Sequence, residues 1–233
     1  MVLGANCLEY DAIDDLLTVN GVCAGSFFGS PFILEAWAQL SGWAGAAGTI
    51  FAAGKTDGQT WAGIYYIGAT KKFRAETKTA AAGSNTIDTA GTYDNDSSLH
   101  HFFMVVDTNG KITNFFVDGA DEGSAIVNTH DLSICDKFYV GQIPWSAPDT
   151  NVWEGLINQV RVYGRAPVAN EAVYNYNNGQ GNMLPYDITD LELWLRLSEG
   201  TGTPADHSGN AHAVTLVGTL WKQIALWDFF TWA

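Results

Sequence analysis

The residues of this chain best suited to chemistry are aromatic. Trp61 and Tyr65 lie in one short segment, and Trp145 and Trp153 flank the segment 143–153, which is long and rich in turn residues. The apolar face of a sugar ring stacks on an aromatic ring, while amide and carboxylate groups exchange hydrogen bonds with its hydroxyls. Because long loops tend to carry function, we predict carbohydrate-binding residues among these four. The alternative is that the rings belong to the core, as most of the nine Trp must.

The composition limits the partners. The chain has 233 residues, 47% hydrophobic and 15% charged, so it can bury a full core. Its net charge of −14 would on average repel a nucleic-acid backbone or an anionic bilayer, so we expect no nucleic-acid partner. The first residues carry no basic and apolar leader, and no stretch approaches about eighteen apolar residues. We therefore expect neither an export signal nor membrane insertion.

Cysteine and histidine give no catalytic pattern. Cys7, Cys23 and Cys135 are odd in number and lack the spacing of a zinc site, which favours buried thiols. His100 and His101 have no nearby serine or cysteine motif to activate. As neighbours in a strand, the two histidines are expected to point to opposite faces.

Hydrophobic residues recur with a period of two along most of the chain, which is typical of strands. The segments with this pattern are 31–40, 60–68, 71–77, 100–107, 111–119, 136–142 and 154–165. Asn109 and Gly110 supply the positive φ angles that a tight hairpin needs. At least eight short strands predict an all-β sandwich or barrel. One segment departs from the pattern: Pro167 and the run Asn177 to Gly179 predict one short helix near 167–177.

Several segments together resemble the laminin-G-like members of the concanavalin A-like lectin/glucanase superfamily. In chain order they are CLEYDAIDDLLTV (7–19), FILEAWAQL (32–40), LHHFFMVVDTNGKITNFFVDG (99–119), FYVGQ (138–142) and WEGLINQVRVYGRAPVANEAVYNYNNG (153–179). The resemblance implies a jelly-roll β-sandwich of two antiparallel sheets, which agrees with the strand pattern. It is closest to the non-catalytic branch. Leu99 and Asn158 stand where the superfamily usually carries a Trp and often carries an acid.

The resemblance also implies sites. The turn 204–212 matches a superfamily loop in which carboxylate and amide oxygens converge on a hard cation, so Asp206 and Asn210 are predicted calcium ligands. The alternative is an Asx-type turn in which both residues bond to the local backbone. Glu9, Asp11 and Asp14 are similar to the acidic triplet of the glucanase branch, where two carboxylates perform retaining hydrolysis. A glucanase-like hydrolase is the remote alternative, and we expect no enzyme.

The segment 190–221 resembles the opening of the superfamily's sandwich but comes last here. An unpaired sheet edge must be closed, so we expect 187–221 to complete the sandwich of a single domain spanning 1–233. The alternatives are donation of these strands to a neighbouring subunit, or a truncated second module. In the aromatic tail 222–233, residues Trp227, Phe229, Phe230 and Trp232 are predicted to anchor another subunit, with a core strand as the alternative.

Two functional classes use this fold equally well. The first is a decorating or fibre protein on the surface of a large assembly such as a phage virion. It would be a homo-oligomer or a partner of other virion proteins, with surface glycans as its ligands. The second is a secreted or periplasmic carbohydrate-binding lectin. The resemblance to stand-alone virion proteins and the acidic composition favour the first.

Overall fold

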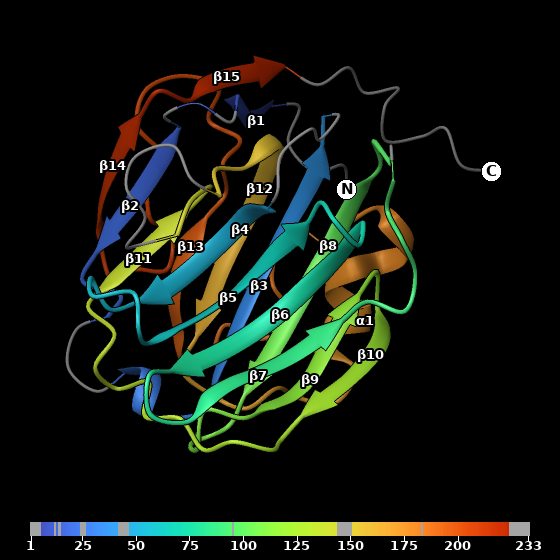
Figure 1. Cartoon of the computed structure of the whole chain (residues 1–233). Coiled ribbons are helices and arrows are strands. Elements are labelled where there is room, and N and C mark those ends of the chain that lie inside the picture. The colour runs from blue at the N-terminus through green and yellow to red at the C-terminus, as the bar shows by residue number, and fades with distance from the viewer. Residues whose placement is uncertain are drawn as a thin grey trace.

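Two antiparallel sheets stacked face to face build the protein in this computed structural model (Figure 1). The structure describes residues 6–11, 13, 15–23, 27–41, 47–94, 96–143, 151–182 and 184–223. Side chains that alternate along each strand interdigitate between the sheets and form one large core. The predicted all-β jelly-roll sandwich is therefore confirmed.

The eight-stranded sheet lies at the back of Figure 1. Its strands follow the order β10 (Ala120–Ala125), β9 (Ile112–Val117), β8 (Leu99–Val106), β3 (Phe32–Leu40), β12 (Glu154–Tyr163), β1 (Asn6–Asp11) and β15 (Leu220–Gln223), and β13 (Leu191–Leu195) also pairs with β12. The seven-stranded sheet faces the viewer. Its order is β14 (Ala213–Val217), β2 (Leu16–Asn20), β11 (Lys137–Val140), β4 (Ala47–Gly54), β5 (Trp61–Ile67), β6 (Lys72–Thr79) and β7 (Gly83–Asp88).

The central strand β12 changes partner along its length. Its first half pairs with β1 and its second half with β13, while β3 lies along its other side. The change falls at an irregularity between Asn158 and Arg161, where Gln159 adopts a φ of 52°. At the start of the strand, a Cβ on Gly155 would lie 1.9 Å from the carbonyl oxygen of Gln39, so this close approach of two backbones requires glycine.

All seven segments with a period of two contain strands, as predicted. The predicted helix is shorter than expected: α1 spans Glu171–Tyr176 and is followed by a 3-10 turn at Asn177–Gly179. Asn170 adopts a left-handed conformation, so Pro167 lies before the helix and not in its first turn. The left-handed end at Asn177 and Asn178 agrees with the prediction. None of the described helices is long and apolar enough to span a membrane.

The C-terminal strands pair with strands from the first part of the same chain. β14 pairs with β2, β15 with β1, and β13 with β12. In Figure 1 the red and orange strands therefore lie beside the blue and gold ones. Residues 224–233, including Trp227, Phe229, Phe230 and Trp232, lie outside the described residues.

Candidate functional site

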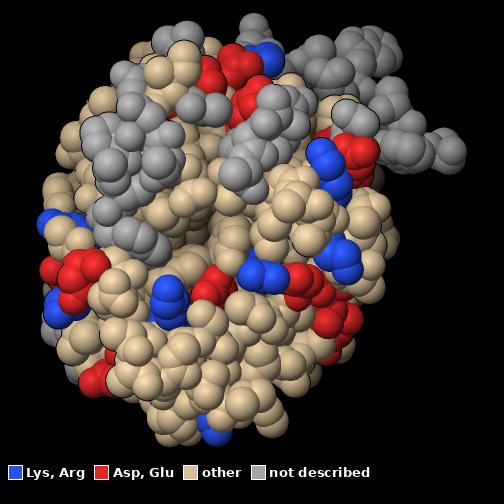
Figure 2. All heavy atoms as spheres, viewed as in Figure 1, with Lys and Arg blue, Asp and Glu red and all other residues tan. Residues whose placement is uncertain are grey.

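The outer face of the seven-stranded sheet is hollowed near its centre (Figure 2). Core residues alternate along its strands, so the intervening side chains point away from the core. We call this surface the open face. Its central residues are Ala52, Gly54, Trp61, Gly63, Tyr65, Lys72, Arg74, Glu76, Lys78, Ser84, Asp88, Lys137 and Tyr139.

Two of the four predicted platform residues lie together on the open face. Trp61 and Tyr65 both come from β5, and their ring centroids are 5.5 Å apart with an interplanar angle of 43°. Neighbours cover most of Trp61, which is 6% exposed, while Tyr65 is half-buried. Tyr65 therefore offers a ligand the larger ring surface of the pair.

Small residues form the floor beside these rings. The strand register places Tyr139 of β11 opposite Ala52 of β4, and Ala52 opposite Gly63 of β5. A Cβ on Gly63 would lie 2.5 Å from the carbonyl oxygen of Phe51, so even alanine would force the strands to shift. Ala52 and Gly63, which have little or no side chain, therefore form a shallow depression between Tyr139 and the Trp61–Tyr65 pair.

A carboxylate holds Tyr65 in place. Tyr65 donates its hydroxyl to Glu76 Oε2 at 2.5 Å, and Ser84 Oγ donates to Glu76 Oε1 at 2.6 Å. Burial and the negative charge of Glu76 raise the pKa of the Tyr65 hydroxyl above its ordinary value. Tyr65 thus remains a neutral hydrogen-bond donor, and its ring has one preferred orientation.

An ion pair lies beside this group. Arg74 forms two hydrogen bonds with Asp88, from Nε to Oδ1 at 2.5 Å and from Nη2 to Oδ2 at 2.8 Å. The Arg74 hydrogen bonds lower the pKa of the Asp88 carboxyl, which remains ionised at neutral pH. The open face therefore combines aromatic rings, a hydroxyl, carboxylates and a guanidinium, the groups that bind sugar hydroxyls and sugar ring faces.

Of the other two predicted platform residues, the structure describes only Trp153, which is not on this face. Trp153 is 0% exposed and belongs to the core between the sheets, where its ring centroid is 6.3 Å from that of Phe73. The prediction of Trp153 as a platform is therefore wrong, because no face of the ring is open to a ligand. Trp145 lies outside the described residues.

The predicted calcium residues form a hydrogen-bonded turn. Asp206 Oδ1 accepts the backbone N–H groups of Trp194 and Ser208, and Oδ2 accepts the Ser208 hydroxyl and the N–H of His212. Burial alone would raise the pKa of Asp206, but these donors lower it below its ordinary value. Asn210 donates its amide to the carbonyl oxygens of Leu191 and Glu192.

Asp206 forms the Asx-type turn of the alternative with Ser208, whereas Asn210 bonds to the backbone of β13 and not to its own turn. A cation at Asp206 would have to displace some of these four hydrogen-bond donors. Among the described residues, no cluster of three or more His, Cys, Asp or Glu side chains could hold a metal ion. Calcium binding stays a prediction, which melting curves recorded with calcium and with chelator would test.

The acidic strand lies away from the open face. Glu9 and Asp11 belong to β1 of the eight-stranded sheet, where Lys222 Nζ donates to Glu9 Oε1 at 2.6 Å. The Asp11 carboxylate accepts the backbone N–H of Ile13 at 2.9 Å. Asp14 lies outside the described residues.

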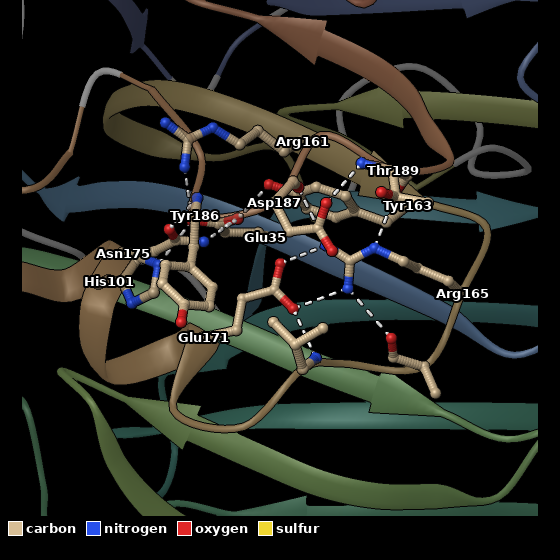
Figure 3. Close-up of polar contacts among 12 residues, drawn as sticks. Glu35, His101, Arg161, Tyr163, Arg165, Glu171, Asn175, Tyr186, Asp187 and Thr189 are labelled. Carbon is tan, nitrogen blue, oxygen red and sulfur yellow. Dashed lines mark hydrogen bonds and ion pairs between the residues drawn. The ribbon is translucent and has the colours of Figure 1, made fainter.

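A second polar cluster lies on the outer side of the eight-stranded sheet, beneath α1 (Figure 3). Glu35 of β3 accepts hydrogen bonds from four side chains: Oε1 from His101 Nε2 at 3.0 Å and Arg161 Nη1 at 2.9 Å, and Oε2 from the Tyr163 hydroxyl and Asn175 Nδ2, both at 3.2 Å. All five side chains are buried. Burial alone would raise the pKa of Glu35, but Arg161 and His101 lower it below its ordinary value.

The chain after β12 is fastened over this cluster. Arg165 Nη1 and Nη2 donate to the two oxygens of Glu171 at 2.8 and 2.6 Å, and Arg165 also donates to the carbonyl oxygens of Thr189 and Asp187 (Figure 3). The backbone N–H of Tyr186 donates to Asn175. Because the side chains around Glu35 are buried and hydrogen-bonded to one another, the cluster attaches α1 to the sheet.

The two neighbouring histidines point to opposite sides of β8, as alternation predicts. His101 joins the Glu35 cluster, while His100 contacts core rings, including that of Phe73 at 6.2 Å. His100 Nδ1 lies 2.6 Å from Asp118 Oδ2 and Nε2 lies 3.1 Å from Asp96 Oδ2. Burial alone would lower the pKa of His100, but these carboxylates raise it overall.

Sequence reasoning missed most polar groups of the open face. Arg74 and Glu76 lie on the predicted strand 71–77, but nothing in the local pattern distinguishes them from solvated charges. Asp88 and Ser84 lie on β7, whose sequence GSNTID has too few hydrophobic residues to show a strand period. Tyr139 could have been predicted as part of the site, because it is an aromatic residue on the outer side of a predicted strand.

Comparison with known proteins agrees with this architecture. A family model for the concanavalin A-like lectin/glucanases superfamily matches residues 16–173, which is more than half of the chain. The chain therefore belongs to this superfamily and has its lectin-like fold. No curated protein matches it in sequence.

Solved structures with the same fold are distant in sequence. A Bacteroides ovatus protein with provisionally assigned carbohydrate binding aligns with 17% identity and a TM-score of 0.65, over 96% of this chain and 61% of its own length. The heptameric SAP-like pentraxin of Limulus polyphemus aligns with 11% identity and a TM-score of 0.58, over 93% of this chain and 97% of the pentraxin chain. The CBM40 module of the Ruminococcus gnavus IT-sialidase aligns with 12% identity and a TM-score of 0.55, over 73% and 97%. The chain thus spans about 61% of the Bacteroides protein.

Proposed function

We propose that the protein is a non-catalytic carbohydrate-binding protein and that a glycan binds on the open face of the seven-stranded sheet. The observation that carries this proposal is the Trp61–Tyr65 ring pair, with Tyr65 oriented by Glu76, beside a floor of small residues. A sugar ring stacks on the accessible part of Tyr65, and Glu76 and Arg74 exchange hydrogen bonds with its hydroxyls. The carbohydrate-binding proteins with the same fold add support at the level of the fold alone.

A glycan-array screen of the purified chain, with calcium and again with chelator, tests the proposal. We expect selective binding that Tyr65→Ala abolishes and Tyr65→Phe weakens, because phenylalanine keeps the ring and loses the hydroxyl that Glu76 orients. Tyr174→Ala is the matched control, since Tyr174 is a 47% exposed tyrosine on α1, away from the open face. A blank array under both conditions, with a folded protein, would refute the proposal.

The finer proposal concerns where the protein acts. We infer a role as a decorating or fibre protein on a large particle of the phage type, with a homo-oligomer or other particle proteins as partners and glycans as ligands. The net charge of −14 supports this role, since an acidic exposed protein does not adhere to nucleic acids. The alternative is an extracellular lectin. Co-sedimentation of the chain with purified particles, detected with an antibody, supports the first role, and a secreted form that never joins a particle contradicts it.

A further inference from the structure

The open face carries an unusual charge for this chain. Four of the 11 basic residues of the protein point outward from it: Lys72, Arg74 and Lys78 on β6 and Lys137 on β11. Among the described residues of β4, β5, β6, β7 and β11, only two acidic residues point outward with them, Glu76 on β6 and Asp88 on β7. Figure 2 shows basic and acidic side chains side by side along the lower rim of the hollow. A surface with more basic than acidic groups thus lies on a protein whose net charge is −14.

Both carboxylates of this surface are already engaged. Glu76 accepts the hydroxyls of Tyr65 and Ser84, and Asp88 forms the two hydrogen bonds with Arg74. In contrast, no ion pair joins Lys78 or Lys137 to an acidic group among the described residues. These two ammonium groups therefore carry charge that the neighbouring carboxylates do not neutralise.

The strand register places the two lysines on one row with the aromatic platform. Lys78 lies directly opposite Trp61 on the neighbouring strand, and Lys137 lies opposite Gly54, which in turn lies opposite Trp61. Three strand spacings separate β11 from β6, a distance of about 14 Å. A ligand that stacks beside Trp61 and contacts both ammonium groups must therefore be longer than a single small group.

We propose that the ligand of the open face is an anionic glycan, an oligosaccharide that carries carboxylate or sulfate groups. This inference rests on the proposed glycan-binding function and specifies its ligand class. Lys78 and Lys137 bind the anionic groups while Tyr65 binds a ring face. The negative charge of the rest of the protein does not prevent this, because charges more than about 8 Å away are largely screened at physiological salt. Local cations in a hollow attract the ligand at short range.

Paired polymers that differ only in charge test the inference. Isothermal titration would compare polygalacturonate with its methyl ester, and dextran sulfate with dextran, at 0.05 and 0.5 M salt. We expect the charged member of at least one pair to bind about tenfold more tightly at low salt, and high salt to remove most of that advantage. The two pairs separate carboxylated ligands from sulfated ones.

Charge-removing variants locate the effect. Lys78→Gln and Lys137→Gln should each weaken binding of the charged polymer about three- to fivefold and leave binding of the uncharged one unchanged. Lys111→Gln, in the turn between β8 and β9, removes the same charge elsewhere and should have no effect. Equal affinity for charged and uncharged members, or equal effects of the three variants, overturns the inference and leaves the proposed function intact. Failure of every polymer and every arrayed glycan to bind refutes the proposed function itself.

Discussion

The two outer faces of this sandwich differ in how far the chain covers their polar side chains. On the eight-stranded sheet, charged and polar side chains lie beneath α1, buried and hydrogen-bonded to one another around Glu35. On the seven-stranded sheet, Glu76 is buried, but the polar groups of Tyr65, Arg74 and Asp88 around it are half-buried beside a hollow. Similar residue types therefore have different roles, because one set is covered by the chain and the other remains available to a ligand. Four changes test or sharpen this contrast.

The largest effect is expected from removing the centre of the buried cluster. Glu35→Ala leaves Arg161 and His101 buried without their acceptor, and removal of one partner of a buried ion pair costs about 3–5 kcal/mol of unfolding free energy. Glu76→Ala on the open face is the matched control and should cost about 1 kcal/mol. Urea denaturation measures both. A Glu35→Ala variant as stable as the control would contradict a structural role for the cluster.

A smaller effect is expected where the chain after β12 is fastened. Arg165→Ala removes the two hydrogen bonds to Glu171, whose side chain is buried, and those to the carbonyl oxygens of Thr189 and Asp187. We expect a loss of about 2 kcal/mol and faster amide exchange in residues 171–190. Hydrogen exchange with mass spectrometry measures this. Unchanged protection there, with glycan binding lost instead, would assign a ligand role to this face.

The pH dependence of stability distinguishes groups inside the sandwich from those on its surface. His100 has a pKa raised above 6.5 in the folded state, so its contribution to stability is full below pH 6.5 and is lost as the pH rises through the folded pKa. His100→Gln should therefore reduce the fall in unfolding free energy as the pH rises above 6.5. His207→Gln, which removes an exposed histidine paired with Glu199, is the control. An unchanged pH profile in His100→Gln would contradict the assignment.

The smallest stability effect is expected on the open face. Asp88→Asn breaks a half-buried ion pair with Arg74, and such pairs contribute less than about 1 kcal/mol. The same change frees the guanidinium, so binding of an anionic glycan should strengthen about threefold. Thermal melts and titration with the charged polymers measure the two effects. Weaker binding in Asp88→Asn would show that Asp88 itself accepts ligand hydroxyls.

Much of the fold could be read from local patterns. Segments such as 32–40 and 154–163 alternate strongly, and the structure contains β3 and β12 there. The edge strands β7 and β10 are polar and have no period of two in their hydrophobic residues, so the sequence does not predict them. Helix α1 begins later than predicted because the conformation of Asn170, which local sequence does not specify, delays its start.

The candidate site was harder to predict than the fold. The sequence placed Trp61 and Tyr65 on one strand, and the structure brings their rings together. It also suggested Trp153, which the structure places in the core, because an aromatic residue has the same local signature on either side of a strand. Glu76 belongs to the site because Tyr65 and Ser84, on the two neighbouring strands, donate hydrogen bonds to it. The sequence alone does not show which strands are neighbours.

The sequence by itself determined the strand class, the superfamily and the acidic character of this protein, because these depend on periodicity and composition. The tertiary structure decided which face stays open and which charges meet there. Trp61, Lys78 and Lys137 come from three strands and share a row only through the register of β11, β4, β5 and β6. Register is set by the packing of the whole core between the sheets, so the chemistry of the open face arises from contacts between segments far apart in the chain.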